Sequence, residues 1–142
     1  MPHPRLYAQT TPDKAAYIMA KTGETVTSLD LEKRANQNAH LFRNCGLKPT
    51  DHLAIMMENH PRFFEILWGA LRAGIIITPI STHLLDEEVA YILNNCEAKV
   101  FIISKKYQKV AAGCCRPMLG RWRLDLDQRG SARGTGLIAR YP

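Results

Sequence analysis

The sequence predicts an α/β fold, a partial and mostly parallel sheet with flanking helices. Three apolar segments suited to buried strands, residues 53–57, 75–77 and 100–103, alternate with helical patterns. Strands that alternate with helices at this spacing form right-handed β-α-β crossovers. The chain has 142 residues, 46% hydrophobic and 23% charged, which fits one globular domain and excludes collagen-like, wholly disordered and disulfide-scaffold proteins.

An N-terminal β-hairpin is expected before the sheet. Residues 14–20 are apolar in their second half, Thr22 and Gly23 are turn residues, and residues 24–27 are rich in β-formers. This pattern predicts two short antiparallel strands.

A helix is predicted from about Ser28 to Asn44. Thr27 suits its N-cap, and Gly46 suits the left-handed residue after its end. Its spacing predicts an inward face of Leu31, Ala35, Asn38, Ala39 and Phe42, and a solvent side of Lys33, Arg34, Gln37 and Arg43.

The next helix follows the strand at 53–57. Asn59 is its predicted cap, Pro61 is tolerated in its first turn, and Gly74 ends it. A wide apolar stripe predicts that the helix is largely buried, with Phe63, Phe64, Leu67, Trp68, Ala70 and Leu71 in its core face.

The strand at 75–77 ends at Pro79, and a third amphipathic helix follows it. Three carboxylates, Asp86, Glu87 and Glu88, fall in the first helical turn, where the helix dipole favours them. The apolar spacing then continues through Val89, Ile92, Leu93 and Cys96. After the strand at 100–103, residues 105–112 open a fourth helix without a second apolar turn.

The character of the sequence changes after Ala112. Residues 113–142 hold five of the nine glycines, and no window longer than five residues keeps a helical or strand period. We therefore predict a folded segment at 1–112 and an irregular, basic tail at 113–142 that is disordered or frame-shifted.

The formal charge of +6 is concentrated in that tail. Residues 1–113 carry 13 Lys and Arg against 11 Asp and Glu, whereas residues 114–142 carry six Arg against two Asp. Trp122 between Arg121 and Arg123 has the pattern of a residue that stacks on single-stranded nucleic acid. Without a fold to fix the ring, no nucleic-acid partner is expected. The Gly134-Thr135-Gly136 segment lacks the flanking strand and helix of a phosphate loop.

The residues that most often carry chemistry form no recognisable site. The histidines show no triad or metal spacing, and the cysteines contain no Cys-x-x-Cys pair, so ordinary histidines and reduced thiols are predicted. These residues are His3, His40, His52, His60, His83, Cys45, Cys96, Cys114 and Cys115. The sequence assigns no catalytic, cofactor-binding or metal-binding residue.

No stretch approaches the 18 to 20 consecutive apolar residues of a membrane span, and residues 1–10 lack the apolar run of a signal peptide. A soluble, cytoplasmic protein is the expectation.

An ordered series of short motifs resembles the N-terminal part of the AMP-forming acyl-CoA synthetases, which are adenylate-forming ligases. The resemblance covers residues 6–110. In order, the motifs are Thr11-Pro12-Asp13-Lys14, Val26-Thr27, Arg34-Ala35-Asn36, Gly46-Leu47, Asp51-His52-Leu53-Ala54-Ile55, Glu58-Asn59-His60-Pro61, Trp68-Gly69-Ala70-Leu71-Arg72-Ala73-Gly74, Thr78-Pro79-Ile80, Glu88-Val89-Ala90-Tyr91-Ile92-Leu93 and Ala98-Lys99-Val100.

The resemblance implies a reaction in which ATP and Mg²⁺ activate a carboxylic or fatty acid as an acyl-adenylate, and coenzyme A then takes the acyl group. The family's Ser/Thr/Gly phosphate loop, which leads to Pro-Lys-Gly, has no match in these residues, and neither does its catalytic lysine. We therefore expect a fragment that binds no cofactor, is inactive alone, and self-associates through an exposed sheet.

Two hypotheses about the function of the chain stay open. Gly113-Cys114-Cys115-Arg116-Pro117 interrupts the family's helical pattern, as a frame change, a truncated gene or a divergent C-terminus would. The first reading is the synthetase fragment. The alternative is a small non-catalytic binding module whose basic tail contacts anionic partners.

Overall fold

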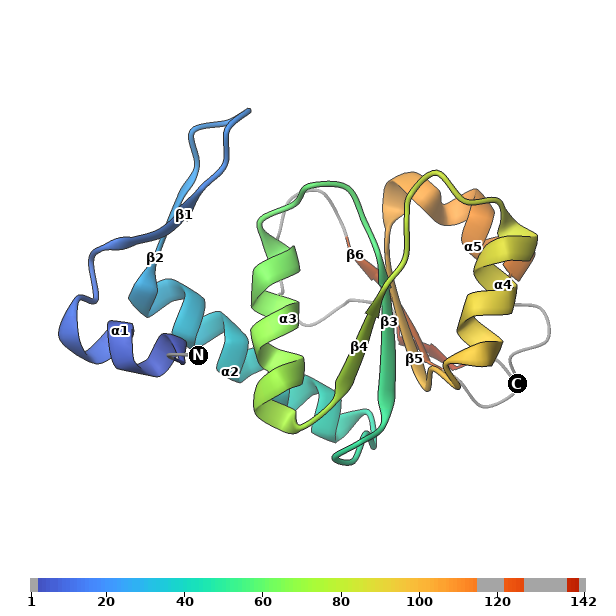
Figure 1. Cartoon of the computed structure of the whole chain (residues 1–142), viewed down its shortest axis with the longest axis horizontal. Coiled ribbons are helices and arrows are strands. Elements are labelled where there is room, and N and C mark those ends of the chain that lie inside the picture. The colour runs from blue at the N-terminus through green and yellow to red at the C-terminus, as the bar shows by residue number, and fades with distance from the viewer. Residues whose placement is uncertain (1–2, 115–121, 127–137, 141–142) are drawn as a thin grey trace. The chain divides into compact units, whose positions relative to one another are not determined.

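The computed structural model describes residues 3–114, 122–126 and 138–140 of the chain (Figure 1). These residues belong to two compact units. Unit 1 comprises Met1–Lys48 and Asn59–Gly74, and unit 2 comprises Pro49–Glu58 and Ile75–Pro142. Helices and strands alternate along the chain, so the predicted α/β class is confirmed.

Unit 1 holds a hairpin and three helices. Helix α1 (Pro4–Thr10) precedes strands β1 (Ala15–Ile18) and β2 (Thr25–Thr27), and helices α2 (Ser28–Asn44) and α3 (Arg62–Ala73) complete the unit. The predicted hairpin is confirmed, because β1 and β2 pair antiparallel. Helix α1 was not anticipated; the proline in its first turn is the sequence signal for it.

The ends of α2 match the sequence prediction. The Thr27 hydroxyl accepts a hydrogen bond from the Asp30 amide at 3.1 Å and caps the helix. Gly46, at φ +82°, takes the left-handed conformation that follows its last turn. The predicted inward residues Leu31, Ala35, Ala39 and Phe42 are buried, and Asn38 is half-buried.

Helices α2 and α3 approach each other closely at Gly69. A Cβ at this position would lie 2.6 Å from the Cβ of Asn38 and 3.0 Å from the carbonyl oxygen of Ala35. The absent side chain therefore sets the separation of the two helices.

The predicted burial of α3 is wrong in detail. Its buried residues are Glu65, Ile66, Gly69, Ala70 and Ala73, whereas Phe64 and Leu71 are 44% and 51% exposed. The small residues of α3 are buried because they face α2. As a result, some of the large apolar side chains of α3 face outward. The cap also differs, since the helix begins at Arg62 and the Arg62 amide donates to Nδ1 of His60 rather than to Asn59.

Unit 2 contains a five-stranded sheet in the order β4-β3-β5-β6-β7. Strands β3 (His52–Met56), β4 (Ile76–Pro79), β5 (Val100–Ser104) and β6 (Trp122–Leu126) are parallel, and β7 (Ile138–Arg140) is antiparallel to β6. The predicted mostly parallel sheet is thus confirmed.

Burial across the sheet follows strand position. Every residue of β5 is buried, as are Leu53–Met57 in and just after β3, which agrees with the two-faced burial predicted from their apolar runs. The prediction fails for the run at 75–77, because β4 lies at the edge of the described sheet and Ile76 is 46% exposed.

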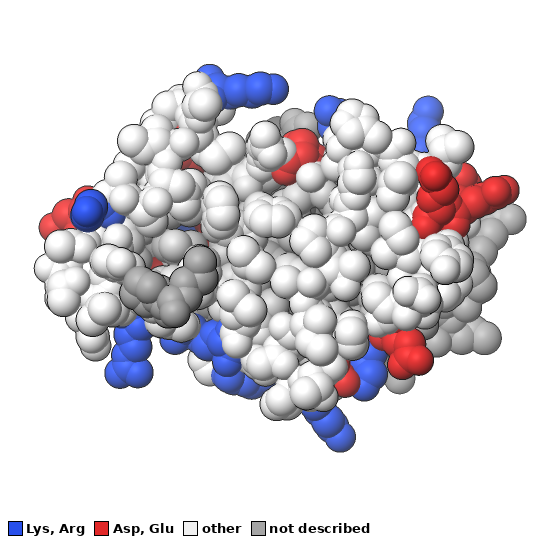
Figure 2. Space-filling view, in the orientation of Figure 1, with Lys and Arg blue, Asp and Glu red and all other residues white. Residues whose placement is uncertain are grey.

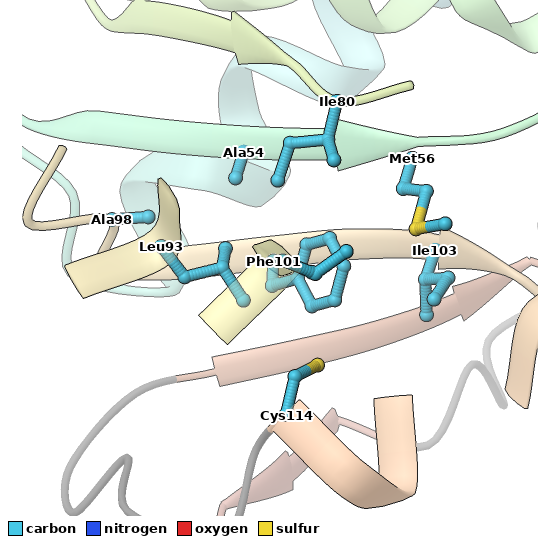
Figure 3. Close-up of a cluster of buried hydrophobic side chains, with 9 residues drawn as sticks. Ala54, Met56, Ile80, Leu93, Ala98, Phe101, Ile103 and Cys114 are labelled. Atoms are coloured by element: carbon cyan, nitrogen blue, oxygen red, sulfur yellow. The ribbon is translucent and has the colours of Figure 1, made fainter. Parts of the chain in front are cut away.

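The core of unit 2 lies between the sheet and helix α4 (Asp86–Asn95). Figure 3 shows Leu93 and Ala98 beside Ala54 of β3 and Phe101 of β5. Cys114 reaches the same cluster from α5 (Gln108–Cys114), which follows the 3₁₀ turn η1 (Lys105–Tyr107).

The segment after Ala112 includes regular structure. Helix α5 continues to Cys114 instead of breaking at Gly113. Strand β6 then pairs in register with β5, with Val100 opposite Trp122 and Ser104 opposite Leu126. Cys115, Arg116, Pro117 and Gly134-Thr135-Gly136 lie outside the described residues.

Candidate functional site

The carboxyl ends of the parallel strands β3 and β5 define the candidate site. Strand β4 lies on one side of β3, and β5 lies on the other. The connection that leaves β3 leads to β4 at one edge of the sheet, whereas the connection that leaves β5 leads to β6 in the opposite direction, so the strand order switches between β3 and β5. In open α/β sheets, ligands bind at this switch point, beyond the carboxyl ends of the strands.

Glu58 and Ser104 occupy this position. Glu58 follows β3 by two residues, and Ser104 is the last residue of β5. The Ser104 hydroxyl donates a hydrogen bond to Oε2 of Glu58 at 2.6 Å, and Ser104 is only 5% exposed. The bond joins the ends of two neighbouring strands that are 46 residues apart in sequence.

This pair is suited to positioning rather than to nucleophilic chemistry. A catalytic serine needs a general base that takes its proton and a donor for the developing oxyanion. The hydrogen bond that the Ser104 hydroxyl makes among the described residues is to the carboxylate of Glu58 and not to a histidine. The Glu58–Ser104 bond therefore holds two strand ends together.

The segments that follow β3, β4 and β5 contain no glycine-rich phosphate turn. Phosphate sites place backbone N–H groups of a glycine-rich turn, or a helix N-terminus, against the anion. No glycine occurs at 57–61, 80–85 or 105–107, the segments that follow β3, β4 and β5. Lys105 and Lys106 are exposed cations at this edge.

A second polar cluster lies inside unit 1, around Glu65. Its side chain is fully buried, and its two oxygens accept from Nη1 of Arg34 at 2.7 Å and Nη1 of Arg62 at 2.9 Å. The hydrogen bond to Glu65 raises the pKa of Arg34. Both carboxylate oxygens of Glu65 are occupied by arginines. Glu65 therefore has a structural role, and its carboxylate is not available as a general base.

Tyr17 lies beside this cluster. Its hydroxyl donates to the carbonyl of Pro61 at 2.7 Å, and its ring packs against Phe64 with centroids 5.1 Å apart. Burial, followed by the negative charge of Glu65, raises the pKa of Tyr17 well above its ordinary value. The phenol therefore stays protonated and acts as a hydrogen-bond donor.

A third polar group connects α1, α2 and α3. Arg72 forms an ion pair with Glu32, and its Nη2 lies 3.3 Å from Nδ1 of His3. The His3 ring meets Trp68 edge-on with centroids 5.6 Å apart. These contacts tie the helices of unit 1 together.

The other histidines and the described cysteines range from exposed to buried. His40 and His83 are exposed, and His52 and His60 are half-buried. Cys45, Cys96 and Cys114 are free thiols, and burial raises the pKa of Cys45. In the part of the chain that the structure describes, no three His, Cys, Asp or Glu side chains gather in a metal-binding group.

Two further sequence candidates have a clear place. Asp86, Glu87 and Glu88 form the first turn of α4, and Oε2 of Glu88 accepts from the Leu85 amide at 2.9 Å, so the predicted helix-start role is confirmed. Trp122 lies on β6, but its side chain is outside the described part of the structure.

The sequence analysis did not identify Glu65 and Glu58, whose carboxylates join neighbouring elements of the fold. Glu65 interrupts an otherwise apolar stripe in α3, and a lone charge in such a stripe indicates a buried ion pair. Arg34 was assigned to the solvent side of α2, whereas it binds Glu65. Ser104 and Glu58 each end a buried strand run, which is the signal for a pair at the strand ends.

Comparison with known proteins identifies the family to which this chain belongs. The family model for the AMP-binding enzymes matches residues 5–134. The chain therefore belongs to the AMP-binding enzyme family, and the resemblance to the N-terminal part of the AMP-forming acyl-CoA synthetases is confirmed.

Three relatives illustrate the match. A crotonobetaine/carnitine–CoA ligase of Proteus mirabilis (strain HI4320) is 33% identical over 81 residues, which is 57% of this chain and 16% of the relative. A fatty acyl CoA synthetase of Mycobacterium tuberculosis aligns with a TM-score of 0.80 and 25% identity, over 87% of this chain and 26% of that one. A benzoate CoA ligase of Burkholderia xenovorans LB400 aligns with a TM-score of 0.78 and 26% identity, over 87% and 24%.

The chain thus spans about one sixth of the curated ligase's length and about a quarter of the two solved chains. Among the helices that the structure describes, none combines the length and hydrophobicity that a membrane span requires.

Proposed function

We propose that this chain is the N-terminal segment of an AMP-forming acyl-CoA synthetase that activates a carboxylic acid with ATP and transfers the acyl group to coenzyme A. The observation that carries the proposal is the family match over residues 5–134. The relatives' names support the acid–CoA ligase class, since they act on crotonobetaine or carnitine, fatty acids and benzoate. These acids differ in size and charge, so the proposal stops at a carboxylic acid.

Within that enzyme, the segment supplies structure rather than reacting groups. Glu65 is saturated by two arginines, and Ser104 is committed to Glu58. No phosphate cradle follows strands β3, β4 or β5, so no step of adenylation is assigned to a described residue. We propose that the 142 residues alone are inactive.

Carboxylate-dependent exchange of labelled pyrophosphate into ATP tests this proposal. The purified chain is assayed with Mg²⁺ and with short, medium and long aliphatic acids, benzoate and crotonobetaine. A full-length relative, such as the Proteus mirabilis ligase, is the positive control. We expect exchange by the control and none by the chain. Exchange that follows the chain through further purification would contradict its inactivity.

The extent of the family architecture remains part of the proposal. The sequence assigns residues 1–112 to the synthetase-like segment and residues 113–142 to a basic tail. The pairing of β6 with β5 and the family match to residue 134 favour a boundary further along the chain. The DNA downstream of codon 112 tests the frame-shift interpretation: a second frame that encodes the Ser/Thr/Gly loop would support it. A single open frame would favour a divergent terminus. The cytoplasmic location predicted from the sequence also stays a prediction.

A further inference from the structure

Helix α4 and the residue before it carry apolar side chains that the core of unit 2 buries and others that stay exposed. Val89 and Leu93 point into the core of unit 2 and have no exposed surface. On the outer side, Leu85 is 69% exposed and Tyr91 is 71% exposed. Leu85 and Tyr91 do not belong to the core cluster, so the fold alone does not account for their exposure.

A shallow hollow runs along this outer side. It has a volume of about 450 Å³ and is lined by Leu84, Glu87, Glu88, Tyr91 and Ile92. These positions follow the i, i+3, i+4, i+7, i+8 spacing of one helix face, so the hollow extends along two turns of α4. Because the hollow is open rather than enclosed, it suits the side chains of a docked peptide segment better than a buried small molecule.

The hollow is acidic in an otherwise basic chain. No Lys or Arg occurs between Arg72 and Lys99, whereas Asp86, Glu87, Glu88 and Glu97 fall in that interval. Within the described part of the chain, the three carboxylates at the start of α4 form no ion pair. Figure 2 shows Asp and Glu atoms gathered at the upper right of the face shown.

We propose that the outer face of α4 is a docking surface for a basic amphipathic segment of a partner protein. Apolar side chains of that segment would cover Tyr91 and the exposed parts of Leu84 and Ile92, which also pack against the core, and its Lys or Arg side chains would pair with Glu87 and Glu88. Exposed tyrosines in apolar surroundings are frequent centres of binding energy, and complementary charge at the rim fixes orientation.

Charge decides between this partner and the alternatives. Nucleic acids and anionic lipid surfaces carry the same sign as Glu87 and Glu88 and are repelled. The helix dipole accounts for carboxylates in the first turn of α4, but it requires no exposed leucine or tyrosine beside them. A cationic amphipathic peptide satisfies both the acidic and the apolar parts of the surface.

The test measures binding of a fluorescein-labelled, 14-residue Leu/Lys amphipathic helix to the full 142-residue chain by fluorescence anisotropy. Tyr91→Ala and Glu87→Gln alter the hollow. The matched controls are Tyr7→Ala, a 43% exposed tyrosine on α1, and Glu24→Gln, an exposed carboxylate of the hairpin. Circular dichroism confirms that each variant keeps the wild-type fold.

We expect saturable binding that Tyr91→Ala weakens at least tenfold and Glu87→Gln weakens about threefold, while both control variants bind like wild type. Binding should fall as salt rises, because the rim contacts are exposed. Equal losses for Tyr91→Ala and Tyr7→Ala would overturn the proposal. So would equal binding of a Leu/Glu peptide, or a wild-type dimer in sedimentation that Tyr91→Ala converts to monomer, since a second copy would then be the occupant.

Discussion

The guanidinium of Arg34 lies 2.7 Å from the fully buried carboxylate of Glu65, and this contact joins α2 to α3. Arg62 binds the other oxygen of the same carboxylate at 2.9 Å. Burial of an unpaired carboxylate raises the free energy of the folded state. The two arginines offset this penalty, so Glu65 can lie on the inner face of α3.

Removal of Arg34 should therefore destabilise the protein. In Arg34→Ala, Glu65 keeps Arg62 but loses half of its pairing, and we expect a loss of about 1 to 3 kcal/mol in the free energy of unfolding. Lys33→Ala, at the adjacent exposed position, is the matched control and should change stability by less than about 0.5 kcal/mol. Urea titration measures both. Equal values for the two variants would contradict a structural role for the ion pair.

Gly69→Ala tests the close approach of α2 and α3 through the sign of its effect. In an open helix, Gly→Ala stabilises by about 0.5 to 1 kcal/mol. Here the new methyl group would lie 2.6 Å from the Cβ of Asn38 and 3.0 Å from a backbone oxygen, neither of which is the flexible end of a side chain. We expect destabilisation by about 1 to 3 kcal/mol in the same titration. An increase in stability would show that the helices are farther apart than described.

The alkaline limit of stability should depend on Tyr17. Burial and the charge of Glu65 raise its pKa in the folded state, whereas an unfolded tyrosine ionises near pH 10. The contribution of this phenol is therefore complete below about pH 10 and is lost as the pH rises further, because only the unfolded state readily releases the proton.

Tyr17→Phe removes this dependence. At pH 8 the variant should lose about 1 kcal/mol, since the Pro61 carbonyl loses its donor. Between pH 9 and pH 11 its stability should fall less steeply than that of wild type. Tyr7→Phe, an exposed tyrosine, serves as the control and should follow wild type. Parallel curves for Tyr17→Phe and wild type would contradict the assignment.

The sequence predicts the parts of the fold that depend on local patterns. The caps of α2, the hairpin and the buried runs at 53–57 and 100–103 all follow from neighbouring residues, and the structure contains them. The inner face of α3 depends instead on which helix packs against it. Burial of Gly69 and Glu65 in place of Phe64 is decided by contacts with Asn38 and Arg34, more than 25 residues away in sequence.

The candidate site could not be predicted from the sequence, because it also depends on contacts between residues that are distant along the chain. Glu58 and Ser104 look like ordinary polar residues after strands, and only the strand order brings them within 2.6 Å of each other. A sequence pattern predicts that strands exist, but not which strands are neighbours. The order β4-β3-β5 is set by the crossover connections and by the shared core.

Self-association through the sheet should depend on β4. This strand is at the edge of the described sheet, and Ile76 is 46% exposed. Exposed strand edges pair readily with other chains, and a charged residue there discourages pairing. We expect Ile76→Lys to lower the apparent mass of the protein in light scattering. Ile18→Lys, on the 62% exposed residue at the end of β1, should leave it unchanged. A monomeric wild-type protein would contradict sheet-mediated association.

Hydrogen exchange at β6 tests how far the folded segment extends. The sequence predicts mobility from residue 113 onward, but the backbone of Trp122–Leu126 pairs with Val100–Ser104, whose side chains are all buried. Amides that donate into a sheet exchange only when the sheet opens. We therefore expect protection at β6 within about tenfold of that at Leu53–Met57. Exchange at the rate of an unstructured peptide would exclude β6 from the stable sheet and support a boundary at residue 112. Protection would instead carry the synthetase-like architecture beyond that boundary, in agreement with a family match that extends to residue 134.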